Sequence, residues 1–88
     1  MQNTNATYIL ASVKGYEDWN CSIVKTTDGK TAGFIIQNRN GKFAAIYQPK
    51  GRVPAKSMLG IAERNTKEEC AEIIIKTYVN RYSRFITI

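Results

Sequence analysis

Two short turn motifs constrain the fold of this 88-residue chain more than any other feature of its sequence. Asp28-Gly29 and Asn40-Gly41 each separate runs of residues that favour β-strands. Asp-Gly and Asn-Gly pairs in this setting are strong signals for β-hairpins, because tight turns need residues that tolerate positive φ. The sequence therefore predicts antiparallel strands at residues 21–26, 32–37 and 42–48.

Further strands are predicted on either side of these hairpins. Residues 8–13 favour a strand at the start of the chain, and residues 15–20 form a polar turn that carries Trp19. A loop at residues 49–54, with a proline at each end, leads to a short predicted strand at residues 55–59.

After Gly60 the apolar pattern changes to the period of a helix. Thr66 and Glu69 have the spacing of a capping box, in which the threonine hydroxyl accepts a hydrogen bond from the Glu69 amide and the glutamate carboxylate reaches back. The residues that follow form one apolar stripe, which consists of Ala71, Ile74, Ile75, Tyr78, Tyr82 and Phe85. This pattern predicts one helix of about 18 residues that packs across the sheet.

The expected fold class is therefore α+β, with an antiparallel sheet of three to five strands packed against one C-terminal α-helix. The chain is shorter than an ordinary domain of about 100 to 200 residues, so residues 1–88 are expected to form a single domain.

The composition argues against several classes of function. The chain has no histidine, which removes the usual general base and the commonest metal ligand, so we expect neither an enzyme nor a metal site. No glycine-rich phosphate loop is present, and we expect no cofactor and no small-molecule substrate. The two cysteines are too few for a disulfide scaffold.

No segment has the length or character of a membrane or secretory sequence. Apolar runs such as Ile73-Ile74-Ile75 are far too short to span a bilayer, which needs about 20 residues. The first five residues are polar and lack the basic start and apolar stretch of a secretory signal. We therefore expect no membrane partner and a cytoplasmic location.

The positive charge of the chain is concentrated in its middle. The formal net charge is +6, and residues 25–64 alone carry eight Lys and Arg against two Asp and Glu. Residues 1–24 have a net charge of −1 and residues 65–88 a net charge of +1. The excess therefore lies on the predicted sheet, which favours an anionic partner such as nucleic acid.

Three segments carry a resemblance to a known family. The segments 41–45 (Gly-Lys-Phe-Ala-Ala), 59–60 (Leu-Gly) and 66–71 (Thr-Lys-Glu-Glu-Cys-Ala) resemble the Apetala-type DNA-binding domain of plant ethylene-response factors. They are also similar to the arm-site-binding domains at the amino termini of tyrosine integrases from phages and mobile elements. The resemblance covers residues 32–85, so residues 1–31 are expected to be additional N-terminal strands. It implies a sheet that lies in the major groove of double-stranded DNA.

Strand alternation and this resemblance together predict a binding site. Alternation places Phe43, Ala45 and Tyr47 on the helix-facing side of their strand, which turns the residues between them outward. The DNA-facing strand positions implied by the resemblance are Lys42, Ala44, Ile46, Gln48, Lys56 and Met58. Arg39 lies on the preceding hairpin, and Lys50 and Arg52 lie on the following loop, within reach of phosphates. The predicted nucleic-acid site consists of Arg39, Lys42, Gln48, Lys50, Arg52 and Lys56.

Two alternatives remain open at this point. Plant members of the family carry arginine and tryptophan on the outer face, whereas an apolar patch is expected here at Ile35, Ile46 and Met58, rimmed by lysines. That patch suits a small protein-binding or inhibitory module, such as a phage protein that contacts a host protein. RNA binding is the other alternative, with Tyr47 as a stacking platform if it faces outward. The outer face stays open for DNA only if residues 1–31 extend the sheet edge rather than fold across it.

Overall fold

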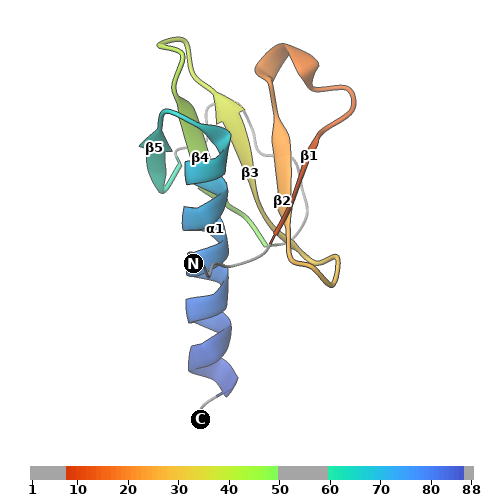
Figure 1. Cartoon of the computed structure of the whole chain (residues 1–88), viewed down its shortest axis with the longest axis vertical. Coiled ribbons are helices and arrows are strands. Elements are labelled where there is room, and N and C mark those ends of the chain that lie inside the picture. Colours follow the sequence, from red (N-terminus) through yellow and green to blue (C-terminus); the bar gives the residue numbers. More distant parts are fainter. Residues whose placement is uncertain (1–7, 50–59, 87–88) are drawn as a thin grey trace, which may run out of the picture.

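The structure is a computed structural model that describes residues 8–49 and 60–86, the last five by their backbone only. Its five strands form one antiparallel sheet in the order β1-β2-β3-β4-β5, and one helix packs on it (Figure 1). The strands are β1 (Ile9–Ser12), β2 (Ser22–Lys25), β3 (Thr31–Gln37), β4 (Phe43–Tyr47) and β5 (Ala62–Arg64), and the helix is α1 (Lys67–Ile86). The predicted α+β class, with a C-terminal helix on an antiparallel sheet, is confirmed.

Both glycine-containing turns close hairpins as predicted. In the β2–β3 turn, Gly29 has a φ of 90° and its amide donates to the Thr26 carbonyl at 2.9 Å. In the β3–β4 turn, Gly41 has a φ of 87° and its amide donates to the Asn38 carbonyl at 3.0 Å. Only glycine adopts such φ values at little cost, so these two residues determine where the chain reverses.

The Asp28 side chain also stabilises the β2–β3 turn. The Thr26 hydroxyl donates a hydrogen bond to the Asp28 carboxylate. This hydrogen bond is the main reason why the pKa of Asp28 is lower than usual. The turn is therefore held by side-chain as well as backbone hydrogen bonds.

The fifth strand differs from the expectation. The predicted strand at 55–59 lies outside the described residues, and the strand that pairs with β4 is Ala62–Arg64, directly before the helix. A strand of three residues is too short to show an alternating pattern, so only its pairing with β4 reveals it. The polar turn predicted at residues 15–20 contains a short 3-10 helix, η1 (Glu17–Trp19).

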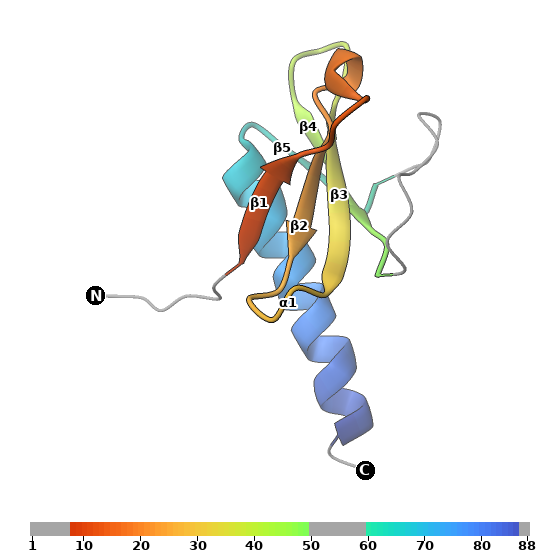
Figure 2. The ribbon, with the colours of Figure 1, turned by 90° about the vertical axis from the view of Figure 1, so that its right-hand side faces the viewer.

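The helix begins at the predicted cap. The Glu69 amide donates to the Thr66 hydroxyl at 3.2 Å, as a capping box requires. The Thr66 hydroxyl in turn donates a hydrogen bond to the Glu69 carboxylate at 3.1 Å. From there α1 crosses one face of the sheet and extends beyond its end (Figures 1 and 2).

The helix and one sheet face enclose the first of two hydrophobic cores. Its buried members lie on α1 and on β2, β3 and β4, and β1 and β5 add the partly buried Leu10 and Ala62. We call this group the helix-side core, and its buried members are Val24, Ala32, Ile35, Ala45, Cys70, Ala71, Ile74, Ile75 and Tyr78.

A second core lies on the opposite face of the sheet. We call it the outer-face core, and its buried members are Cys21, Phe34, Ile36, Ala44 and Ile46. Val13, Trp19 and Ile23 pack against it from the first hairpin and from the loop that contains η1. The central strands are therefore buried on both faces, which is a stronger constraint than a sheet with one solvated face.

Candidate nucleic-acid interface

The outer face of the sheet is not the open surface that the sequence suggested. β1 and β2 extend the sheet at its edge, as the DNA-binding hypothesis required. Even so, Ile46 is only 1% exposed and Ala44 only 7% exposed. These two side chains cannot contact base edges in a groove, so the implied DNA-facing role of Ala44 and Ile46 is wrong.

Ile35 lies on the other face from the one expected. It pairs with Ala45, so its side chain belongs to the helix-side core, where it is fully buried. The reason is the length of the β3–β4 turn. If Asn40 and Gly41 were the two central residues of a tight turn, Ile35 would lie opposite Ile46.

The observed turn has one more residue than that. The backbone amide of Asn38 donates to the Lys42 carbonyl at 2.8 Å, so the loop between these residues contains three residues, 39–41. The pairing of β3 with β4 therefore moves by one position. A shift of one residue turns a side chain to the opposite face of the sheet. The expected apolar patch is therefore wrong at Ile35 and Ile46, and its third member, Met58, lies outside the described residues.

Tyr47 faces the helix and not the outer surface. It packs against the helix-side core, and the Arg81 guanidinium of α1 lies 5.0 Å from the centre of its ring. A ring covered in this way is not available to stack on a base, so the condition set for RNA binding by Tyr47 is not met.

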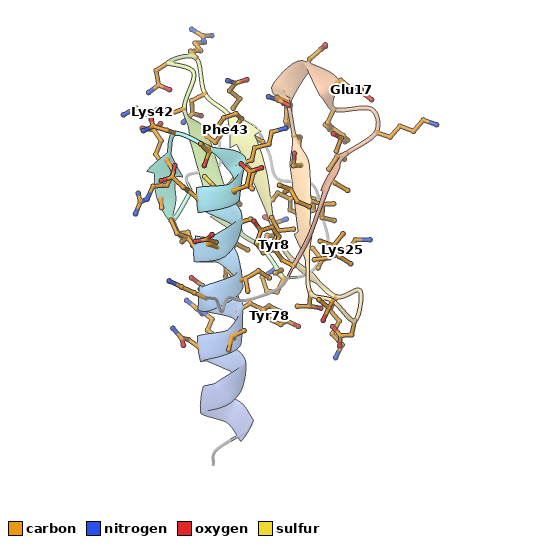
Figure 3. The ribbon with its side chains drawn as sticks, in the orientation of Figure 1. Tyr8, Glu17, Lys25, Lys42, Phe43 and Tyr78 are labelled. Carbon is orange, nitrogen blue, oxygen red and sulfur yellow. The ribbon has the colours of Figure 1, made fainter. Side chains whose placement is uncertain are left out.

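Two of the predicted DNA-binding residues are exposed at the β3–β4 hairpin. Arg39 lies in the turn and Lys42 directly precedes β4, where its side chain points away from the sheet (Figure 3). Gln48 is half-buried, and its amide donates to the Ala32 carbonyl at 3.2 Å, which continues the β3–β4 ladder. Lys50, Arg52 and Lys56 lie outside the described residues.

A third cation joins this end of the sheet. Arg64 on β5 is exposed and pairs with Phe43, so it lies at the same end of the sheet as Lys42 but on the helix-facing side. Its guanidinium donates to the Glu63 carbonyl at 2.8 Å. We call Arg39, Lys42 and Arg64 the hairpin-end cations. Arg64 belongs to the basic segment 25–64 but not to the predicted site, because the short strand β5 carries no periodic signal in the sequence.

A hydrogen-bond network connects the β3–β4 hairpin to neighbouring parts of the chain. The Asn20 amide donates to Gln37 Oε1 at 3.0 Å, and the Gln37 amide donates to the Gly41 carbonyl at 3.0 Å. Lys67 Nζ donates to Asn20 Oδ1 at 2.8 Å and lies 5.8 Å from the centre of the Phe43 ring. The network thus connects the start of β2, the end of β3 and the first turn of α1.

The carboxylate of Glu63, the residue before Arg64 on β5, has another partner. The side-chain amide of Asn38 donates a hydrogen bond to Glu63 Oε2 at 2.6 Å. Within the described part of the chain, Arg39 and Lys42 form no ion pair with a carboxylate. Their charges are therefore available to an external anion.

The cysteines do not add reactive chemistry to this site. Both are buried and neither forms a disulfide. Burial raises the pKa of the Cys21 thiol, an effect that the Lys67 charge partly offsets. Burial likewise raises the pKa of the Cys70 thiol, which donates to the Phe43 carbonyl at 3.3 Å. Thiols with raised pKa values are poor nucleophiles at neutral pH, so both cysteines act as core residues.

Residues 8–49 and 60–86 contain no group of three or more side chains placed to hold a metal ion. In the same residues, no helix combines the length and the apolar character needed to cross a membrane. No protein-family model, curated protein or solved structure gave a significant match to this chain.

Proposed function

We propose that this protein binds double-stranded DNA without catalysing a reaction, and that the hairpin-end cations contact the phosphates of the DNA backbone. The observation that carries this proposal is the exposure of Arg39, Lys42 and Arg64 on one end of the sheet, supported by a hydrogen-bonded frame. Because this hydrogen-bond network already holds the backbone of the β3–β4 hairpin in place, the backbone loses little conformational entropy on binding.

The burial of the outer-face core changes the expected mode of binding. Base readout needs donors and acceptors that reach into a groove, and the outer strand positions Ala44 and Ile46 are apolar and buried. Binding that rests on phosphate contacts depends on charge and on salt, and it discriminates weakly between sequences. We therefore expect a binder whose affinity varies little among duplexes of different sequence.

The first test is the salt dependence of binding, measured by fluorescence anisotropy with a labelled duplex. The logarithm of the association constant should fall by about 0.9 per phosphate contact for each unit of log salt concentration. Arg39→Ala with Lys42→Ala should make this slope shallower by about 2 and should lower the affinity at every salt concentration.

A matched control removes the same charge elsewhere. Lys30 and Lys76 are exposed, Lys30 on the β2–β3 turn at the opposite end of the sheet and Lys76 on α1. Lys30→Ala with Lys76→Ala should leave the slope almost unchanged. Equal losses in the two double variants would show that net charge, and not the hairpin end, causes binding.

Two other results would reject the proposal. One is the absence of duplex binding even at low salt. The other is a clear preference for single-stranded RNA over duplex DNA. A third variant, with alanine at Lys50, Arg52 and Lys56, measures what the other predicted site residues add.

A further inference from the structure

β1 forms an exposed edge of the described sheet. It pairs with β2 only, and Ile9, Ala11 and Ser12 are exposed, with Ile9 at 44%. Natural proteins usually protect such edges with charged residues, prolines or bulges. The sequence of β1 is Ile-Leu-Ala-Ser, which contains none of these residues, and its register with β2 is regular. Among the residues that the structure describes, nothing covers this edge, so another strand can pair with it.

The β1–β2 ladder shows which backbone groups point outward. The Val13 amide donates to the Cys21 carbonyl at 3.0 Å, so the hydrogen-bonded pairs alternate from there and include Ala11 with Ile23. Leu10 and Ser12 occupy the positions between these pairs. Their N–H and C=O groups point away from β2, where an added strand would find them.

We propose that a second copy of this chain occupies this edge, with β1 of one copy antiparallel to β1 of the other about a twofold axis at Ala11. In this register Leu10 lies opposite Ser12 of the second copy, so the outward N–H and C=O groups of both residues find partners. Ile9 lies beside Val13 of the second copy, which covers part of its exposed side chain. The two sheets become one continuous sheet, with both α1 helices on the same face.

Charge favours a second copy as the occupant, and it favours this register. This register brings Lys14, which lies in the Val13–Tyr16 turn directly after β1, close to Tyr8 of the second copy, whereas a twofold axis at Leu10 or at Ser12 would separate them. Tyr8 lies beside α1 (Figure 3), and burial followed by the charges of Glu72 and Glu68 raises the pKa of its hydroxyl. Lys14 would therefore enter a region of negative potential.

The rest of the surface near β1 does not oppose pairing. Residues 1–24 have a net charge of −1, so the strand that meets its copy carries none of the positive excess of the chain, and Lys25, which pairs with Ile9, lies one strand further from the contact. The hairpin-end cations are not part of the contact, so this inference is independent of DNA binding.

Sedimentation equilibrium over a wide range of protein concentration tests the proposal. We expect the apparent mass to rise from 9.9 kDa towards twice that value. Amide hydrogen exchange gives a residue-level signature: Leu10 and Ser12 should gain protection as concentration rises, whereas Ala11 should be protected at every concentration.

Two kinds of variant locate the interface. Ser12→Pro removes an outward N–H that β2 does not use, and it should raise the dimer dissociation constant by about ten- to a hundredfold. Lys14→Glu should also weaken the dimer, and Lys14→Glu combined with Glu72→Lys should restore it. Lys76→Glu makes the same charge change on α1 and should have little effect.

The charge variants keep the test decisive if the proline variant fails to fold, because Lys14, Glu72 and Lys76 are all exposed. A chain that stays monomeric at every concentration would overturn the proposal. So would a dimer that is insensitive to both Ser12→Pro and Lys14→Glu.

Discussion

Gly33 on β3 lies close to both β4 and α1, and it has no space for a side chain. A methyl group at this position would overlap the Ile46 carbonyl oxygen and would lie 2.9 Å from Ile74 Cγ2. The carbonyl belongs to the neighbouring strand and cannot move without breaking the ladder. Gly33→Ala should therefore lower the free energy of unfolding by about 1 to 3 kcal/mol, measured by urea denaturation.

An exposed helix position provides the control for this substitution. Asn80→Ala on α1 should change the free energy of unfolding by less than about 0.5 kcal/mol. If Gly33→Ala were as mild as Asn80→Ala, the close packing of helix on sheet at this point would be disproved.

At the scale of the element, the amino terminus of α1 depends on one side chain. The Thr66 hydroxyl accepts the Glu69 amide hydrogen bond and also contacts the Glu69 carboxylate. Thr66→Ala removes both contacts and should cost about 0.5 to 2 kcal/mol of folding free energy in chemical denaturation. Thr66→Ser keeps the hydroxyl and should stay close to the original stability. Equal losses in the two variants would show that the methyl group of Thr66, and not its hydroxyl, is what matters.

At the scale of the whole molecule, the two cores should contribute comparably to stability. Ile74 belongs to the helix-side core and Ile46 to the outer-face core, and both are almost completely buried. Ile46→Ala and Ile74→Ala should each lower the free energy of unfolding by about 2 to 5 kcal/mol. A negligible effect of Ile46→Ala would mean that the outer face is exposed, and it would reopen the apolar patch as a protein-binding surface.

The parts of the structure that the sequence predicted correctly are encoded in short windows. Gly29 and Gly41 mark the turns because few residues tolerate positive φ, and the cap at Thr66 marks the start of the helix. The face of Phe43 and Tyr47 was also predicted correctly, because alternation along a single strand needs no partner. Each of these features depends on residues fewer than ten positions apart.

The errors concern features that depend on the relation between strands. Ile35 was assigned to the wrong face because one additional residue in the β3–β4 loop changes the register. β5 was missed because its three residues become a strand only by pairing with β4. Of the hairpin-end cations, Arg39 was predicted from the hairpin that carries it and Lys42 from the strand positions that the resemblance implies, whereas Arg64 joined them only through that pairing.

The sequence by itself determined the fold class, the two hairpins, the helix and the concentration of positive charge on residues 25–64. Turn chemistry and helical periodicity act locally, so they can be recognised without knowing what packs where. Only the tertiary structure decided that Ile46 and Ala44 are buried, because burial depends on segments distant in the sequence. That decision moves the proposed DNA contacts from the face of the sheet to its hairpin end, where the charges remain in contact with water.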